Sequence, residues 1–328
     1  MAATNNDVFI LFPLTYIIPT YILYTVELFT MFVNRRGTKF AGSFFNIWVS
    51  SAINNLICSI LYFVTYRGSK AVILGRIYSI IPSSGFFITL ILFIVYGSGS
   101  TQVVLDLVLC FNRFTVVWMG TKHVTFWKKY CKIILFIAFC IPAATTWETW
   151  FFDVKLSLKN ASDPNQGYVW NPTNTKAIPW MQTPLIICGT VVITATLSFL
   201  MNCYVCWYLL KQKKNKNGGK MISKQDLKLF LYNLLIFLTQ AVQFCLQMVF
   251  LLLPPGHILY SFAISIQFFV MDVNSLAPAW FILFMSSALR TSIMDFFGKT
   301  RVSVFMISTN SGVGNHHLRM RNTGTSSN

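Results

Sequence analysis

Acidic side chains lie within or beside long apolar stretches of this 328-residue chain, where an ionised group is costly and marks a candidate functional site. Four such residues occur: Glu27, Asp106, Glu148 and Asp272. Asp106 precedes Arg113 by seven residues, which is two helical turns, so both side chains point the same way along one helix. We interpret this pair as a polar switch. The alternative is an Arg113 that snorkels to the interface and an Asp106 satisfied by neighbouring polar groups.

Amide side chains recur at helical spacing farther along the chain. Gln240, Gln243 and Gln247 are three and four residues apart and therefore share one helix face. Amides turned toward lipid would lack hydrogen-bond partners, so this face is expected to point into a helix bundle. There Gln243 and Gln247, together with Gln267, are candidate ligand contacts. Hydrogen bonding between helices is an equal alternative.

One segment near the C-terminus has the composition of a hinge. Asp272 and Asn274 flank Val273, and Asn274 stands four residues before Pro278. Proline removes a backbone hydrogen bond and kinks a helix, while nearby polar side chains can bind the freed backbone groups. We therefore predict a hinge formed by Asp272, Asn274 and Pro278.

Aromatic residues gather near the predicted outer ends of the apolar stretches. Trp147, Trp150 and Trp180, with Glu148 among them, are candidates for lining a pocket that binds a small organic ligand. For any single tryptophan the alternative is the aromatic belt found at membrane interfaces. Sequence alone leaves both interpretations open.

The sequence lacks residue sets typical of catalysis or metal binding. It contains no recognisable nucleophile–base pair, phosphate-binding loop or metal-ligand cluster, so we expect no enzyme activity, no cofactor and no metal. Cys203 and Cys206 have the CxxC spacing of redox and zinc motifs, but no second cysteine pair accompanies them. We interpret both as packing residues or as palmitoylation sites.

Composition indicates the broad class of protein. Hydrophobic residues make up 55% of the chain and charged residues 11%, against about 25% charged in soluble domains. A soluble domain of this size could not bury so much apolar surface, which excludes a soluble enzyme and a disordered chain. The net charge of +17 is spread over short clusters between apolar runs, so we expect no nucleic acid partner. The chain is predicted to be a polytopic membrane protein in contact with membrane lipids.

Hydropathy predicts an all-α, polytopic bundle of transmembrane helices, because about 20 mostly apolar residues cross the hydrocarbon core. The third stretch carries Gly97-Ser98-Gly99-Ser100 near its middle, so it is either one tilted helix or a shorter span. Residues 71–83 are too short to span and are interpreted as an outer loop or interfacial segment. Seven stretches qualify as spans: residues 8–33, 41–66, 87–118, 131–152, 181–210, 227–253 and 258–288.

Basic residues predict the orientation of this bundle. Nineteen lysines and arginines fall in the first, third and fifth loops and the tail, and six in the N-terminal segment and the other loops. Because basic loops stay in the cytoplasm, residues 1–7 are predicted to be extracellular and the C-terminus cytoplasmic. Residues 289–298 have the spacing of an amphipathic helix along the membrane surface. Residues 299–328 have the composition of a disordered cytoplasmic tail.

Two segments resemble a known receptor family. The first is Cys110-Phe111-Asn112-Arg113-Phe114-Thr115-Val116-Val117 with His123 and Trp127-Lys128-Lys129. The second is Pro278-Ala279-Trp280-Phe281-Ile282-Leu283-Phe284 with Ser286, Ser287, Leu289 and Arg290. Both are similar to nematode serpentine chemoreceptors of the gamma-class superfamily, class gamma or class V, which are divergent G-protein-coupled receptors. The resemblance covers the whole chain, and residues 106–130 and 272–290 carry its specific part.

The resemblance implies roles for residues at the cytoplasmic end. Arg113 resembles the arginine of the Asp/Glu-Arg-Tyr element of rhodopsin-like receptors, with Asn112 in place of the acid. With that adjacent ion pair missing, Asp226 is our candidate for the group that holds Arg113. Coupling to a heterotrimeric G protein is expected through Arg113, Asp106 and the basic fifth loop, including Lys211, Lys213 and Lys214.

The function that the resemblance implies is chemosensory. A small environmental or pheromone-like molecule, or a peptide, would bind in the outer half of the bundle and activate a G protein in the plasma membrane of sensory neurons, often on their cilia. The main alternative is a small-solute or proton-coupled transporter that uses Asp106, Asp272 and Glu27, although the chain lacks the internal repeat common in transporters. A ligand-gated channel subunit of opposite orientation is a second alternative, and the distribution of basic residues counts against it.

The predicted topology implies a glycan at Asn160, because the sequon Asn160-Ala161-Ser162 falls in the fourth loop, on the outer side. Asn160→Gln should abolish a glycosidase-sensitive mass shift of the expressed protein on a denaturing gel. Asn171→Gln is the matched control, because Pro172 blocks the sequon that begins there. If a sequon engineered into the first loop were glycosylated while Asn160 was not, the orientation would be reversed.

Overall fold

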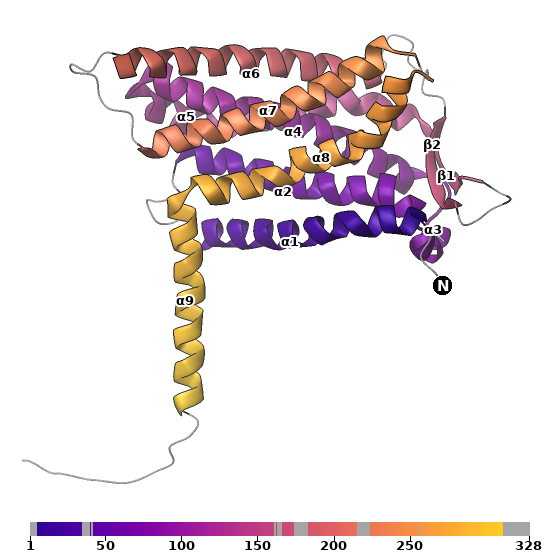
Figure 1. Ribbon diagram of the computed structural model, residues 1–328, viewed down its shortest axis with the longest axis horizontal. Helices are drawn as coiled ribbons and strands as arrows, with labels where there is room; N and C mark the ends of the chain where they lie inside the picture. Colours follow the sequence, from indigo (N-terminus) through magenta and orange to yellow (C-terminus); the bar gives the residue numbers. More distant parts are fainter. Residues whose placement is uncertain are drawn as a thin grey trace, which may run out of the picture.

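Seven long apolar helices run side by side in one bundle in a computed structural model of the chain (Figure 1). The structure describes residues 5–34, 40, 42–160, 162, 166–173, 183–214, 224–254 and 256–310. Within these residues, seven stretches are long and apolar enough to cross a membrane: Phe12–Val33, Ser43–Lys70, Phe86–Met119, Lys122–Phe151, Leu185–Lys211, Leu227–Leu252 and Ile258–Met285. The predicted bundle of seven transmembrane helices is confirmed, and its orientation stays a prediction.

The long helices are joined by connections at both ends of the bundle, and two of these connections contain turns, a short helix or strands. Its long helices are α1 (Asn5–Val33), α2 (Ser43–Tyr62), α4 (Phe86–Met119), α5 (Lys122–Thr146), α6 (Thr183–Lys214), α7 (Lys224–Leu252) and α8 (Ile258–Met285). Between α2 and α4 lie the π-helical turn η2 (Phe63–Arg67), the 3₁₀ turns η3 (Gly68–Lys70) and η4 (Val72–Leu74), and the short helix α3 (Gly75–Ile80). After α5 come the 3₁₀ turn η5 (Trp147–Phe151) and the strands β1 (Asp153–Leu158) and β2 (Tyr168–Thr173).

The structure corrects the predicted start of the fourth span and the length of the third loop. The span was expected at residues 131–152, but α5 begins at Lys122, and only two residues separate it from the end of α4. The chain reverses there at Gly120, whose φ of 54° is a conformation that glycine adopts without strain. Lysine is a good helix former, so a lysine-rich segment lowers hydropathy without ending a helix. The basic residues assigned to the third loop therefore stand on α5: Lys122, Lys128, Lys129 and Lys132.

The third span is a single helix. α4 runs unbroken for 34 residues through the Gly97–Ser100 run, which gives a length of about 50 Å at 1.5 Å per residue. Small side chains there allow close approach of the neighbouring helices. Asn54 of α2 donates a hydrogen bond of 2.9 Å to the Ser98 carbonyl, and a Cβ at Gly97 would lie 3.6 Å from Oγ1 of Thr146. The run is a helix-packing surface and not a break.

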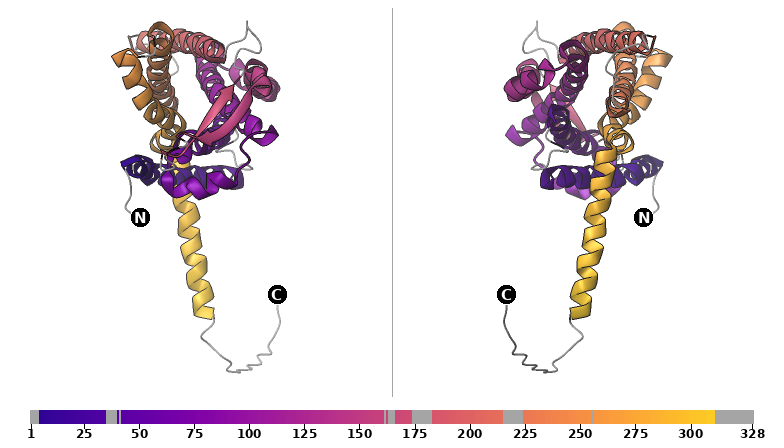
Figure 2. Two further views of the ribbon diagram at one scale, coloured as in Figure 1. Left: turned by 90° about the vertical axis from the view of Figure 1, so that its right-hand side faces the viewer. Right: turned by 90° about the vertical axis from the view of Figure 1, so that its left-hand side faces the viewer.

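A two-stranded antiparallel hairpin lies across one end of the bundle, which we call the hairpin end (Figure 2, left). The strands pair from Asp153 with Thr173 to Leu158 with Tyr168. Gly167 has a φ of 74° and approaches η3 so closely that a Cβ would lie 2.7 Å from the Ser69 carbonyl oxygen. All eight cysteines are free, so apolar packing and not a disulfide holds the hairpin. The buried residues of this cluster are Tyr78, Ile88, Leu92, Phe152, Val154, Leu156 and Trp170.

Residues 71–83 form short helical turns that are packed on the hairpin end. Tyr78 of α3 anchors them, because its hydroxyl donates to the Val64 carbonyl and its ring stacks on Tyr168 of β2. Burial raises the pKa of Tyr78 to about 12, so the hydroxyl keeps its proton at neutral pH. The segment interpreted as an outer loop or interfacial segment thus helps to close this end of the bundle.

The main apolar core fills the opposite half of the bundle. It combines the C-terminal half of α1, the start of α2, the second half of α4, and the first turns of α5 and α7 with the end of α8. Its largest fully buried side chains include Trp48, Trp127, Tyr24 and Tyr232. The bundle is therefore tightly packed toward this end, which we call the α9 end after the helix that leaves it.

Helix α9 (Ser287–Asn310) begins directly after α8 and runs across the direction of the bundle (Figures 1 and 2). The Ser286 hydroxyl accepts a hydrogen bond from the Leu289 amide at its start, and the Arg290 guanidinium donates to the carbonyls of Leu283 and Phe284. A helix at this angle lies parallel to the plane of a membrane that the bundle crosses. It extends beyond the predicted residues 289–298, and residues 311–328 of the predicted tail lie outside the described residues.

Candidate functional site

A cavity of about 270 Å³ lies inside the bundle, in the half toward the hairpin end. This volume is slightly below the range of roughly 300–1,000 Å³ for ligand pockets. α2, α4, α6, α7 and α8 enclose it together with η2. Its lining residues are Tyr62, Tyr66, Val95, Tyr96, Gly99, Ser100, Gln102, Val103, Asp106, Ile187, Thr190, Val191, Thr194, Ala195, Gln240, Gln243, Gln247, Gln267, Phe268, Met271 and Asn274.

Amide side chains from three helices converge on this cavity, as the spacing on the sixth span predicts. Gln243, Gln247 and Gln267 all line it, so the structure brings these three candidate ligand contacts together. Asn274 donates to the Oε1 atom of Gln243 at 3.4 Å, and hence both alternatives for this face, cavity lining and helix-to-helix hydrogen bonding, occur at once. The result is a polar, mostly uncharged wall formed by α7 and α8.

Asp106 lines the cavity and is hydrogen-bonded to α7. Its Oδ2 atom accepts a hydrogen bond from Gln240 Nε2 at 3.3 Å, and the residue is 6% exposed. Its Oδ1 atom and the Nε2 atom of Gln102 are buried without a hydrogen-bond partner among the described residues. Both residues line the cavity, so its wall contains an acceptor and a donor that no described residue satisfies.

The aromatic residues predicted to line a pocket lie elsewhere. Trp147 and Trp150 are 38% and 39% exposed at the hairpin end, where Trp150 stacks on Phe86. Glu148 is buried in η5, but none of the three contributes to the cavity. Trp180 lies outside the described residues. Of the two interpretations, the described tryptophans fit the interfacial belt better.

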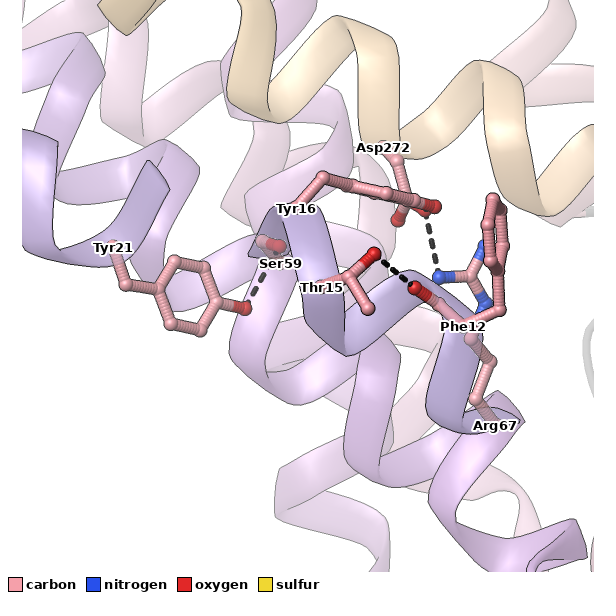
Figure 3. A network of polar contacts seen from close by, with 7 residues as sticks. All are labelled: Phe12, Thr15, Tyr16, Tyr21, Ser59, Arg67 and Asp272. Carbon is pink, nitrogen blue, oxygen red and sulfur yellow. Dashed lines mark hydrogen bonds and ion pairs between the residues drawn. The ribbon is translucent and has the colours of Figure 1, made fainter. Parts of the chain in front are cut away.

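An ion pair that the sequence did not predict lies behind the cavity wall. Arg67, assigned from the sequence to the second loop, is 2% exposed, and its Nη1 atom lies 2.7 Å from Oδ2 of Asp272 (Figure 3). The Tyr16 hydroxyl of α1 donates to the same carboxylate oxygen. Asp272 thus joins α1, the turn η2 and α8 at one point.

The same arginine also contacts the cavity lining. Its guanidinium carbon lies 5.8 Å from the ring centre of Phe268 and 5.5 Å from that of Phe269. Phe268 lines the cavity, and its ring also packs against Tyr62. The ion pair of Arg67 and Asp272 therefore helps to hold this wall of the cavity in place through Phe268.

The sequence contains a weak indication of the ion pair between Arg67 and Asp272. Arg67 follows the apolar run of the second span directly, and Asp272 is an acid inside the seventh. A buried acid in a membrane needs a counter-charge, and an arginine at a span boundary reaches inward by several ångströms. The sequence does not tell which of the basic residues near the span ends supplies it.

Arg113 lies in the packed half, toward the α9 end. Its guanidinium carbon is 4.2 Å from the ring centre of Phe44 of α2, and the residue is 9% exposed. The Phe44 ring in turn packs edge-on against Tyr232 of α7. Asn112 beside it donates to the Ser43 hydroxyl at 2.8 Å. The Asn112-Arg113 element therefore joins α4 to α2 and lies next to α7.

The remaining predicted residues are placed only in part. The side chains of Asp226, Lys213 and Lys214 lie outside the described residues, so the proposed partnership of Asp226 with Arg113 stays a prediction. Lys211 is exposed at the end of α6, with its Nζ atom 5.1 Å from the ring centre of Trp207. Pro278 is buried inside a continuous α8. Among the described residues no three His, Cys, Asp or Glu side chains gather as a metal site.

Seven membrane-crossing helices around a small, amide-lined cavity are the architecture of serpentine membrane receptors. Comparison with known proteins gives the family. The model of the Srg family of chemoreceptors matches residues 10–293, and the chain belongs to this family.

Two curated relatives support the same assignment. The chain is 24% identical over 304 residues to serpentine receptor class gamma-15 of Caenorhabditis elegans, covering 87% of this chain and 85% of the relative. It is 25% identical over 198 residues to serpentine receptor class gamma-31 of the same species, covering 58% and 59%. The predicted nematode chemoreceptor family is confirmed, and of the two classes left open by the sequence these findings favour class gamma.

The buried ion pair should show strong energetic coupling. Arg67→Met or Asp272→Asn alone should destabilise the protein by about 3–5 kcal/mol, because each leaves a buried charge or polar group without its partner. The double variant should be clearly more stable than the sum of both losses. The measurement is the temperature at which buried cysteines such as Cys58 react with a thiol-specific dye in purified protein.

Lys70→Met is the matched control for this cycle. Lys70 also lies over the Phe268 ring, at 4.8 Å, but it forms no ion pair with a carboxylate in the described part of the chain. Its loss should change the unfolding temperature little. Additive effects of the two single variants would show that Arg67 and Asp272 act independently.

Proposed function

We propose that this protein is a G-protein-coupled chemosensory receptor whose ligand binds in the amide-lined cavity. The observation that carries the proposal is the cavity itself, because five of the long helices, from both halves of the chain, enclose it. It takes a small molecule with an aromatic or aliphatic body and a few hydrogen-bonding groups. Tyrosine and phenylalanine rings contact the body, while glutamines and Asp106 contact the polar groups.

Helix α4 connects this cavity to the proposed coupling element. Asp106 lines the cavity, and Arg113 lies seven residues farther along the same helix, about 10 Å toward the α9 end. Phe44 and Tyr232 lie between α4 and its neighbours α2 and α7 at that level. A ligand that favours one packing of α4 against α7 by a few kcal/mol would shift the populations of the two packings and change the surroundings of Arg113.

The α9 end would then face the heterotrimeric G protein. The distribution of basic residues supports this assignment, because it places the α9 end in the cytoplasm. The plasma membrane of sensory neurons, and their cilia in particular, is the location that family membership suggests. A carrier role for Asp272 is less well supported, because its charge is already compensated by Arg67.

Filling the cavity should abolish ligand responses. A Cβ at Gly99 meets nothing within 4 Å, so Gly99→Leu places its side chain in the cavity without a backbone clash. Membranes containing the receptor are mixed with a panel of purified Gα subunits and pools of small odorants and peptides, and guanine-nucleotide exchange is measured. Gly99→Leu should raise the half-maximal ligand concentration at least roughly tenfold, a loss of about 1.4 kcal/mol or more of binding free energy, and up to complete loss of the response, because the leucine occupies volume that the ligand needs.

Gly189→Leu is the control for this experiment. Gly189 stands on α6, a Cβ added there also meets nothing within 4 Å, and the residue does not line the cavity. An unchanged response in Gly99→Leu would remove the cavity from ligand binding. Silence of the wild-type protein across the panel, together with solute flux that depends on Asp106, would instead support a transporter.

Removal of Arg113 should uncouple the receptor from the G protein while sparing the ligand site. Arg113→Ala is expected to lose most ligand-dependent exchange, with ligand affinity and surface expression within about threefold of wild type, because Arg113 lies outside the cavity lining. Arg76→Ala at the hairpin end is the control. Exchange that survives in Arg113→Ala would exclude this residue from coupling.

A further inference from the structure

A groove of about 900 Å³ runs along the side of the bundle between α1, α2 and α5, near the α9 end. It is separate from the ligand cavity and shares no lining residue with it. Its walls face outward, since Phe29, Phe32 and Ile53 are 50%, 74% and 48% exposed. On a bundle that crosses a membrane, side chains exposed in this way contact lipid.

Two lysines of α5 line the groove in the half of this helix that lies toward the α9 end. Lys128 and Lys132 both line it, both are exposed, and they are four residues apart, so their side chains leave the same face of α5. Neither forms an ion pair with a carboxylate in the part of the chain that the structure describes. Glu27 of α1 is completely buried, and Asp295 lies on the exposed surface of α9. The groove therefore presents positive charge that the described residues leave uncompensated.

The two lysines stand inside the boundary of the hydrocarbon core on the side of the α9 end, and lysine side chains at such positions extend toward the lipid headgroups. The span Lys122–Phe151 has 30 residues, about 45 Å of helix, which matches the 40–45 Å of a bilayer with its headgroup regions. Lys128 and Lys132 stand about 9 and 15 Å from its start. Their flexible side chains can extend toward the phosphate level, while the apolar part of the groove continues into the hydrocarbon core.

The floor of the groove is rigid. Trp127 is 2% exposed, and its Nε1 atom donates to Oγ1 of Thr115 at 2.8 Å, the same oxygen that lies 3.0 Å from Nδ1 of His123. One wall is held by α9, because the Phe296 ring packs edge-on against Phe29 at 5.4 Å. A site with fixed walls loses little conformational freedom when it is occupied.

We propose that this groove binds one anionic phospholipid of the leaflet at the α9 end. An acyl chain lies along Phe29, Phe45 and Ile53, and the phosphate lies between the ammonium groups of Lys128 and Lys132. The predicted orientation makes this the cytoplasmic leaflet, where anionic lipids are enriched and basic pockets between helices bind their headgroups. A zwitterionic lipid would fill the same volume but would bring no net charge to the two lysines.

The test is native mass spectrometry of the full-length protein in detergent with equal amounts of phosphatidylserine and phosphatidylcholine that carry identical acyl chains. Wild type should retain phosphatidylserine in preference. Lys128→Gln/Lys132→Gln should lower that retention roughly 30-fold, about fivefold per lysine. Lys128→Arg/Lys132→Arg should retain phosphatidylserine like wild type. That result would show that the double glutamine variant loses the lipid because it lacks the two charges.

The matched control is Lys122→Gln/Lys129→Gln. These residues are on the same helix and give the same change in net charge, but neither lines the groove. The control should retain phosphatidylserine like wild type. An equal loss in both double variants would overturn the proposal, because it would show a general effect of charge. Equal retention of the two lipids by wild type would overturn it as well.

A second pair of variants tests the apolar part. Ile53→Trp narrows the groove and should reduce retention of both lipids, whereas Ile57→Trp is a similarly exposed position on α2 outside the groove and should not. Displacement of the lipid by millimolar inorganic phosphate would identify a free-anion site in place of a lipid site. If Ile53→Trp changed the proportion of dimer without changing lipid retention, the occupant of the groove would be a second copy of the chain.

Discussion

Polar groups inside a bilayer find no water, so each must be satisfied by another part of the protein. In this bundle the constraint produces the contacts that tie helices together. Asn54 of α2 donates to the Ser98 carbonyl of α4, the Tyr24 hydroxyl of α1 donates to the Ser275 carbonyl of α8, and Trp280 donates to Thr20. The Arg67–Asp272 pair is the charged case of the same rule. Lipid contacts every apolar face of a helix equally well, so contact with lipid does not select which face turns outward. The polar contacts between helices therefore determine which faces turn inward.

The two halves of the bundle satisfy this constraint differently. Toward the α9 end, large side chains such as Trp48 and Tyr232 fill the interior around the buried polar groups. Toward the hairpin end, amides and hydroxyls surround a space that the side chains do not fill. The proposed ligand site lies in this hollow half, and the proposed coupling element around Arg113 lies in the packed half.

Periodicity and hydropathy predict the part of the structure that depends on local chemistry. The number of spans, the inward face of Gln243 and Gln247, and the helix after the seventh span all follow from spacing along the chain. The predicted start of α5 was wrong because hydropathy treats Lys122–Lys132 as a loop, whereas lysine is compatible with helix. Arg67 was missed for a different reason. Its partner is 205 residues away in the sequence, and only the packing of α1, α2 and α8 brings the two together.

The two arginines that are buried among the described residues lie in different surroundings. Arg67 is bound to a carboxylate that also receives a tyrosine hydroxyl, and separating such a pair leaves a buried charge, which costs several kcal/mol. Arg113 instead lies over the face of Phe44, a contact of about 2 kcal/mol or less, with a neutral asparagine where rhodopsin-like receptors carry an acid. In the proposed mechanism, a movement of α4 against α7 changes the surroundings of Arg113, whereas Arg67 keeps the wall of the cavity fixed. A receptor needs both properties, because binding requires a defined site and signalling requires an element whose packing has two states of similar free energy.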